Sequence, residues 1–307
     1  MKRVVVLGAG AIGSTVAMRL ALAGHDVTVV ARGSRLEALR ADCAIVTVTG
    51  QRIPVRVSDA IPACDLVIVP VKPWQVDAVV PMLKACGAPV MFMFNEWRGV
   101  QALREAVGRE RFAWGFPAIV AALRDGKLEA QVVPRALERV QITTIGALND
   151  FRPAWLDGWA KNFTEAGIPT VECSDMEAWL STHAAVMAPL MAAGVRAQTR
   201  LTWSDAKAVV HAWREGVRLV RARGLEVTPV SVDGLVRTPA WLLTFALWLA
   251  AKFGALSSLA DNGAEEPRFL LEAMAREPGA QLAGVQRLLT SDELSSQRGA
   301  GHSTKRS

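Results

Sequence analysis

The chain has 307 residues, of which 51% are hydrophobic and 21% charged, and its formal net charge is +6. A chain of this length usually forms two domains, and a hydrophobic share this large excludes disorder for most of it. The four cysteines form no Cys-x-x-Cys pair and the four histidines are dispersed, so no metal site is expected, and the lack of tyrosine excludes mechanisms that need a tyrosine general acid.

Charge and hydropathy indicate neither a nucleic-acid nor a membrane partner. The basic residues are spread along the chain, which is typical of a solvated surface. The apolar run after Met1-Lys2-Arg3 is too short for a signal peptide, and the apolar stretch 240–251 falls short of the about 20 residues that span a bilayer. We therefore expect a cytoplasmic protein in which 240–251 forms a buried helix or the subunit-interface helix of a homodimer.

The first half of the chain alternates short apolar runs with helical segments. We predict strands at 3–8, 26–31, 65–71, 89–94, 111–114, 131–133, 141–145 and 170–172, and helices at 11–24 and 153–166. Strands that alternate with helices favour a parallel sheet with right-handed crossovers. The strands at 131–133 and 141–145 are expected to be antiparallel additions to it.

A GxGxxG motif at 8–13 follows the first predicted strand and opens the first predicted helix. In such a turn Gly8 allows the sharp bend, Gly10 lets a pyrophosphate approach the backbone, and Gly13 lets helix and strand pack closely. The amides at the start of the helix face the phosphates. The residues expected to bind a dinucleotide here are Gly8, Ala9, Gly10, Ala11, Ile12 and Gly13.

The end of the second predicted strand indicates which dinucleotide binds. Enzymes that use NAD usually carry an acidic residue there, which bonds the ribose hydroxyls. This strand instead ends at Ala31 and is followed by Arg32, with Ser34 and Arg35 nearby. A guanidinium is suited to a 2′-phosphate, so we predict NADPH as the cofactor, bound in part by Arg32 and Ser34.

Three further segments resemble the ketopantoate reductase family, also called the 2-dehydropantoate 2-reductases. Residues 65–75 (DLVIVPVKPWQ) are similar to its strand that ends in a Val-Lys-x-Trp-Gln motif, residues 92–95 to its strand that ends in Asn-Gly, and residues 121–126 to its Ala-Arg-x-Asp-Gly segment. The likeness covers residues 1 to about 150. It implies a Rossmann-type cofactor domain, a helical second domain and NADPH-dependent reduction of a carbonyl.

The resemblance also implies roles for particular residues. By this likeness Lys72 and Asn95 contact the cofactor or the substrate, and Ala122 lies at the cofactor. Lys72 and Asn95 both follow predicted parallel strands, and open α/β sheets bind their ligands at the carboxyl ends of such strands. Glu96 stands where the family has glycine, which puts a negative charge near the expected nicotinamide position.

From residue 174 onward the strand signals nearly vanish. The predicted helices are 175–199, 204–223, 239–259, 265–276 and 279–289. Ser204 and Asp205 are expected to cap the second of these helices and Gly224 to end it. Arg214 and Glu215 on the same helix are expected to form an exposed ion-paired face. The predicted fold is therefore α/β: a Rossmann-type NADP-binding domain over 1–172, an all-helical substrate and dimerisation domain over 173–294, and a disordered tail over 295–307.

The first helix of the second domain departs from the family. Pro189-Leu190 matches, but Leu180 stands in place of the family's catalytic lysine, and Ala184 and Ala188 stand in place of its two asparagines. The usual acid and polar contacts to ketopantoate are thus missing. In the late helices the resemblance offers Glu272 as a cofactor contact, with Ser257 or Ser258 as equivalents of a family serine.

His183 is the acid–base side chain that remains in this stretch of the helix. Its ordinary pKa near 6.5 suits a general acid that protonates a developing alkoxide. Apolar residues that include Trp179 and Met187 share its helical face, so a histidine of the core is the alternative.

We predict an NADPH-dependent oxidoreductase of the ketopantoate reductase type. It would reduce the carbonyl of a 2-keto acid or a less polar ketone by hydride transfer in the cleft between its domains, with His183, Lys72 and Asn95 as catalytic residues. An imine- or opine-type reductase and a non-catalytic NADPH-binding sensor remain the alternatives. Its expected partner is a small carbonyl or imine substrate.

Overall fold

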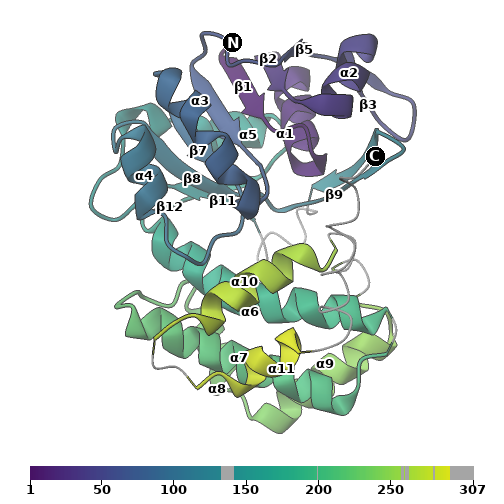
Figure 1. Cartoon of the computed structure of the whole chain (residues 1–307), viewed down its shortest axis with the longest axis vertical. Helices are drawn as coiled ribbons and strands as arrows, with labels where there is room; N and C mark the ends of the chain where they lie inside the picture. Colours follow the sequence, from purple (N-terminus) through teal and green to yellow (C-terminus); the bar gives the residue numbers. More distant parts are fainter. Residues whose placement is uncertain (133–141, 199, 257–258, 260–262, 279–280, 291–307) are drawn as a thin grey trace, which may run out of the picture. The chain divides into compact units, whose positions relative to one another are not determined.

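The computed structural model of the chain describes residues 1–132, 142–198, 200–256, 259, 263–278 and 281–290 (Figure 1). The chain divides into two compact units. One, the sheet unit, comprises Met1–Asn95 and Val100–Met176, and the other, the helical unit, comprises Glu96–Gly99 and the chain from Glu177 onward. The predicted tail at 295–307 lies outside the described residues.

The sheet unit is built on an eight-stranded sheet with the order β12-β11-β8-β7-β6-β1-β2-β5. Its strands are β1 (Arg3–Leu7), β2 (Asp26–Val30), β5 (Arg56–Ser58), β6 (Leu66–Val69), β7 (Val90–Phe92), β8 (Phe112–Phe116), β11 (Thr143–Gly146) and β12 (Thr170–Cys173). Six neighbouring strands of this sheet are parallel, in the order β8, β7, β6, β1, β2 and β5. At the other side β11 is antiparallel to β8, and β12 is parallel to β11. The predicted parallel sheet is confirmed, as is the antiparallel strand near 141–145.

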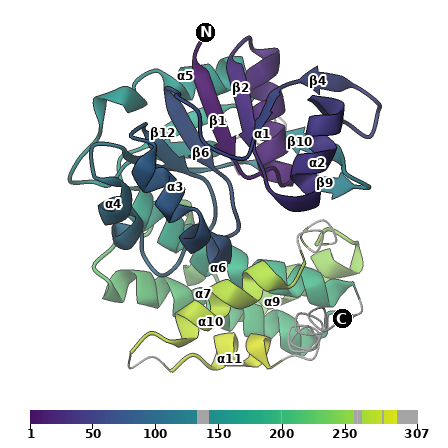
Figure 2. The ribbon, with the colours of Figure 1, turned by 45° about the horizontal axis from the view of Figure 1, so that its top comes forward.

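Short helices connect these strands. They are α1 (Ala11–Leu22), α2 (Gly33–Asp42), α3 (Val80–Ala85), α4 (Gln101–Val107) and α5 (Trp159–Glu165), with 3-10 turns at Pro73–Ala78 and Ala154–Leu156. Helix α1 packs against β1 and β2 (Figure 2). Its small buried residues Gly13, Ser14 and Ala17 let it approach the sheet closely, while Val16 and Leu20 enter the core of the unit.

Two hairpins add a second layer to the sheet unit. They are β3–β4 (Ala44–Val46 and Arg52–Pro54) and β9–β10 (Ile119–Arg124 and Lys127–Val132). The second hairpin turns at Asp125-Gly126, which both have positive φ (50° and 77°), as a two-residue type I′ turn requires. It contacts α1 and β3, and the Val48 N–H donates to the Leu128 carbonyl (3.0 Å). The sequence predicted only the end of β10, at 131–133, and expected it as an addition to the main sheet. That expectation was wrong, because β10 pairs with β9 in a separate two-stranded sheet.

The helical unit contains α6 (Met176–Ala197), α7 (Trp203–Ala222), α8 (Ser231–Arg237), α9 (Ala240–Lys252), α10 (Glu265–Ala275) and α11 (Ala283–Leu289). All five predicted helices are present, although α9 ends at Lys252 rather than near 259, and α8 is an addition. The cap of α7 is Thr202 rather than Ser204: its hydroxyl accepts from the Asp205 N–H (3.2 Å), and Asp205 Oδ2 accepts from the Thr202 N–H (2.9 Å). Gly224 follows the helix with φ 74°, as predicted.

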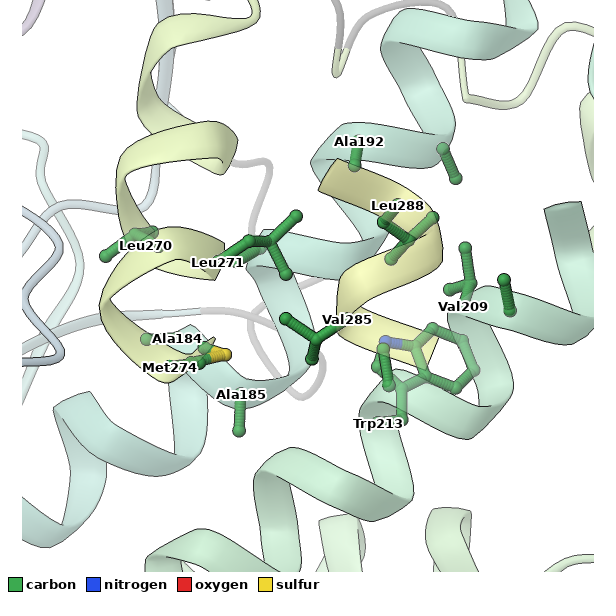
Figure 3. Close-up of a cluster of buried hydrophobic side chains, with 14 of the residues drawn as sticks. Ala184, Ala185, Ala192, Val209, Trp213, Leu270, Leu271, Met274, Val285 and Leu288 are labelled. Carbon is green, nitrogen blue, oxygen red and sulfur yellow. The ribbon is translucent and has the colours of Figure 1, made fainter. Parts of the chain in front are cut away.

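Helix α6 contributes a row of alanines to this unit's core, among them Ala184, Ala185 and Ala192 (Figure 3). Its alanines, such as Ala184 and Ala185, let neighbouring backbones approach: a Cβ added at Gly216 of α7 would lie 2.8 Å from the Ala185 Cβ. Among the described residues α6 is the one unbroken helix long and apolar enough to cross a membrane. It is 67% buried over its most apolar window, which is how a core helix packs.

The face of α7 around Glu215 is buried, contrary to the expected exposed ion pair. Glu215 is 4% exposed, and its carboxylate accepts the N–H groups of Gly284 and Val285 at the start of α11 (both 3.0 Å). Arg214 instead donates to the carbonyl oxygens of Val236 and Thr238 (3.1 and 2.7 Å). The two side chains therefore fix α11 and the end of α8, and the carboxylate lies where a helix N-terminus favours negative charge.

Helix α9 corresponds to the apolar stretch at 240–251. It packs on α7 through Thr244 and Leu247, but Trp241 (67% exposed) and Phe245 (45% exposed) remain at the surface. The helix is thus only partly buried, and its role as a subunit interface stays a prediction.

Candidate functional site

The glycine turn between β1 and α1 has the geometry that dinucleotide binding needs. Gly8 has φ 128°, a conformation that side chains rarely adopt. A Cβ at Gly13 would lie 1.9 Å from the Gly8 carbonyl oxygen, so only glycine allows helix and strand to pack this closely. At Gly10, by contrast, an added Cβ would meet no atom within 4 Å. Gly10 is exposed, so a side chain would occupy the open space beside it, which is the space that the sequence assigns to a pyrophosphate.

This turn lies where the direction of strand succession reverses. β1 is flanked by β2 on one side and by β6 on the other, and all three are parallel. Doubly wound sheets bind ligands at the carboxyl edge at this switch point. The loop after β6 packs against the glycine turn. A Cβ added at Gly8 would lie 3.1 Å from Val71 Cγ1, and one added at Gly13 would lie 2.9 Å from Pro70 Cγ.

Lys72 and Asn95 lie at equivalent places on neighbouring strands. Val69 of β6 pairs with Phe92 of β7, and each predicted site residue follows three positions later. Lys72 is half-buried, with its Nζ 5.9 Å from the centroid of the Trp74 ring, and Asn95 is 6% exposed. Both therefore belong to the carboxyl edge that carries the glycine turn, as the sequence predicted.

The three polar residues after β2 have different environments. Arg32 is the exposed N-cap residue of α2, and Ser34 is exposed in the first turn of that helix. Arg35, which the sequence placed near a 2′-phosphate, points back to the glycine turn: its Nε donates to the Ala9 carbonyl (3.1 Å). Of the three residues, Arg32 and Ser34 are the ones exposed to solvent, and they remain the predicted contacts of a 2′-phosphate.

The loop after Asn95 belongs to the helical unit. Trp97 is 1% exposed in the helical core, where its Nε1 donates to Glu277 (3.0 Å) and the Arg223 guanidinium stacks on its ring at 4.2 Å. Glu96 is also buried, and its carboxylate accepts the Trp97 and Arg98 N–H groups (both 2.9 Å) and pairs with the Arg98 side chain (2.8 Å). Its charge is therefore neutralised within the loop.

His183 has an environment that argues against the predicted acid role. The ring stacks on Trp179 with centroids 4.7 Å apart, and its Nε2 is shielded from solvent. Burial lowers the pKa of His183 to about 3. Since the imidazole is then neutral near pH 7, it has no readily given proton, which argues against the role of general acid. That role stays a prediction.

The titration of His183 predicts a pH dependence of stability. The pKa of His183 is lower in the folded protein than in the unfolded chain, so protonation of the ring favours unfolding. The free energy of unfolding that the neutral ring contributes above about pH 6.5 is therefore lost as the pH falls towards the folded pKa. We therefore expect a loss of about 2 kcal/mol between pH 7 and pH 4.5 in the wild type. In His183→Phe, which retains a ring beside Trp179, urea unfolding at the two pH values should lack this loss.

The control for this experiment is His211→Phe, since His211 is exposed on α7. This variant should keep the pH dependence of the wild type. Turnover supplies an independent readout: a fall of about a hundredfold per folded molecule in His183→Phe would restore the acid role.

The remaining predicted residues lie on elements other than the glycine turn. Ala122 is in β9, opposite Glu129 in the hairpin. Glu272 of α10 is ion-paired with Arg268 (3.1 Å) and Arg276 (3.7 Å). Leu180, Ala184 and Ala188 of α6 are buried, so the positions matched to the family's lysine and asparagines carry apolar packing. Ser257 and Ser258 lie outside the described residues.

Comparison with protein families settles the relationship of the first half of the chain. Residues 4–148 match the family described as ketopantoate reductase PanE/ApbA. Over these residues the chain is similar to the ketopantoate reductase family. The 2-dehydropantoate 2-reductase of Archaeoglobus fulgidus is 33% identical over 110 residues (36% of this chain), and that of Vibrio cholerae is 30% identical over 155 residues (47%). The matches span only 34% and 48% of the length of these relatives.

Solved structures extend the likeness of fold to the whole chain. A 2-dehydropantoate 2-reductase from Geobacter metallireducens GS-15 has a TM-score of 0.67 at 18% identity, covering 96% of this chain and 99% of the other. D-mandelate dehydrogenase in complex with NADH has a TM-score of 0.70 at 12% identity, covering 98% and 99%. The ketopantoate reductase family fold, with its helical second part, is thus the fold of this chain.

Proposed function

We propose that the protein is a cytosolic reductase that transfers a hydride from NADPH to the carbonyl of a small-molecule substrate. The observation that carries this proposal is the open space beside Gly10, at the carboxyl edge that also holds Lys72 and Asn95. The glycine-turn amides and the start of α1 would hold the pyrophosphate, and Arg32 and Ser34 the 2′-phosphate. The nicotinamide, when bound, supplies the hydride.

Lys72 and Asn95 are the polar side chains available for the carbonyl. The Lys72 ammonium has N–H donors, which would stabilise the negative charge that grows on the carbonyl oxygen and pass a proton to it. The Asn95 amide can both donate and accept, and would orient the substrate. His183 is left out of this scheme because burial keeps it neutral.

The substrate we favour is a 2-keto acid with an apolar side group. Leu180, Ala184 and Ala188 provide no hydrogen bond for the hydroxyl groups of a substrate such as ketopantoate. The structural similarity to D-mandelate dehydrogenase adds an aromatic 2-keto acid to the compounds worth testing, and NADH as the rival cofactor.

An NADPH- and NADH-oxidation assay against 2-keto acids, apolar ketones and cyclic imines tests the proposal. Turnover of phenylglyoxylate or an aliphatic 2-keto acid supports it. Turnover of imines alone would assign an imine reductase. Tight NADPH binding without turnover would assign a sensor. This second candidate is favoured by the neutral, buried His183 and by Leu180, which stands in place of the family's lysine.

The choice of cofactor predicts a selective effect of Arg32→Ala. A hydrogen-bonded charge pair contributes about 1.5–3 kcal/mol, so the KM for NADPH should rise roughly tenfold to a hundredfold while that for NADH stays nearly constant. Steady-state kinetics with both cofactors provide the measurement. Equal changes in the two KM values would remove Arg32 from the 2′-phosphate site.

A further inference from the structure

Arg35 is held against the glycine turn by three hydrogen bonds. Its Nε donates to the Ala9 carbonyl (3.1 Å), one terminal nitrogen donates to Ser14 Oγ (3.2 Å), and the other donates to the Gly126 carbonyl (2.8 Å). The side chain is half-buried, and burial lowers the pKa of its guanidinium from the ordinary value. One planar group thereby joins α2, the glycine turn and the β9–β10 hairpin.

These bonds fix the orientation of one peptide group in the turn. The Ala9 carbonyl accepts from both Arg35 Nε and Ser14 Oγ (3.1 and 3.2 Å). The Ala9–Gly10 peptide is trans and planar, so its C=O and N–H point in opposite directions. Holding the carbonyl towards Arg35 therefore directs the Gly10 N–H away from it, before any ligand binds.

We propose that Arg35 is a positioning residue that presets the glycine turn for a pyrophosphate and takes no part in reading the 2′-phosphate. This inference rests on dinucleotide binding at the turn, as proposed above. The preset amide lowers the ordering cost of binding, and this saving applies equally to NADPH and NADH because both contain the pyrophosphate. Arg32, which is exposed at the start of α2, distinguishes the two cofactors.

The test compares Arg35→Met and Arg35→Lys with Arg40→Met, a control on the same helix whose arginine is exposed and pairs with Asp59 at 2.9 Å. Dissociation constants are measured by fluorescence titration with NADPH and NADH, and by competition with 2′-AMP, which has the 2′-phosphate but no pyrophosphate. In Arg35→Met both dinucleotides should bind about tenfold more weakly, and 2′-AMP should bind as in the wild type.

Arg35→Lys keeps the charge without the planar fork and should give an intermediate loss for both dinucleotides. If Arg35→Met does not fold, this variant provides the measurement. Arg40→Met should bind all three ligands like the wild type. Unchanged dinucleotide affinity in the Arg35 variants would overturn the proposal, and so would a loss confined to NADPH and 2′-AMP. A wild-type protein that binds neither dinucleotide would instead overturn the proposed function itself.

Discussion

Replacing Gly10 by valine should abolish dinucleotide binding and leave a folded protein. Gly10 has φ −68° and extended ψ, which valine adopts without strain, and its added Cβ would meet no protein atom within 4 Å. The branched side chain would instead occupy the space that the pyrophosphate needs. A loss of one well-placed phosphate site should weaken NADPH binding by at least a hundredfold, measured by fluorescence titration.

Gly234→Val is the matched control for Gly10→Val. Gly234 of α8 likewise has no atom within 4 Å of an added Cβ and has no positive φ. It should reduce neither NADPH affinity nor turnover, and circular dichroism should show both variants folded. Wild-type NADPH affinity in Gly10→Val would place the phosphates elsewhere on the protein.

Replacing Lys72 by methionine should lower turnover by about a hundredfold to a thousandfold, the usual cost of removing one donor to a developing oxyanion. Methionine keeps much of the apolar length of lysine and removes its charge and its donors. Because Arg32 and the glycine turn remain intact, the dissociation constant for NADPH should change far less than kcat. Single-turnover hydride transfer and an NADPH titration separate the two quantities.

Lys84→Met provides the comparison, since Lys84 is exposed in the last turn of α3. It should retain wild-type turnover. If Lys72→Met also retains it, Lys72 is an ordinary lysine of the loop after β6, and water must supply the proton.

The sequence predicted those parts of the fold that rest on local pattern. The strands β1, β2, β6 and β7 are rich in apolar residues, and each was found within two residues of its expected ends. The predicted backbone roles of Gly8 and Gly13 in the turn are confirmed because their spacing reflects backbone geometry, and the role of Gly10 stays a prediction. Helices α3 and α4 have only 6 and 7 residues, too few to show a helical period, and they were missed.

What the sequence could not provide depends on contacts between distant residues. Arg35 reaches partners 26 and 91 positions away, and its proximity to Arg32 in the chain gave no sign of these contacts. From the sequence we expected an ordinary pKa for His183. Burial lowers this pKa, and burial depends on packing that the sequence does not show. Glu215 was expected at the surface beside Arg214, whereas its partners are the amides of a helix 69 and 70 residues further on.

The buried Trp97 affects the order in which parts of the protein fold during synthesis. Trp97 is hydrogen-bonded to Arg223 and Glu277, which follow it in the sequence by 126 and 180 positions. Both partners therefore leave the ribosome long after Trp97 does. Until then the indole ring has no apolar partner from the late helices. Contacts this far apart in sequence form slowly, and transiently exposed aromatic surface promotes aggregation. A chain shortened after Met176 would keep the eight-stranded sheet and the Trp97 ring while losing the core that buries that ring.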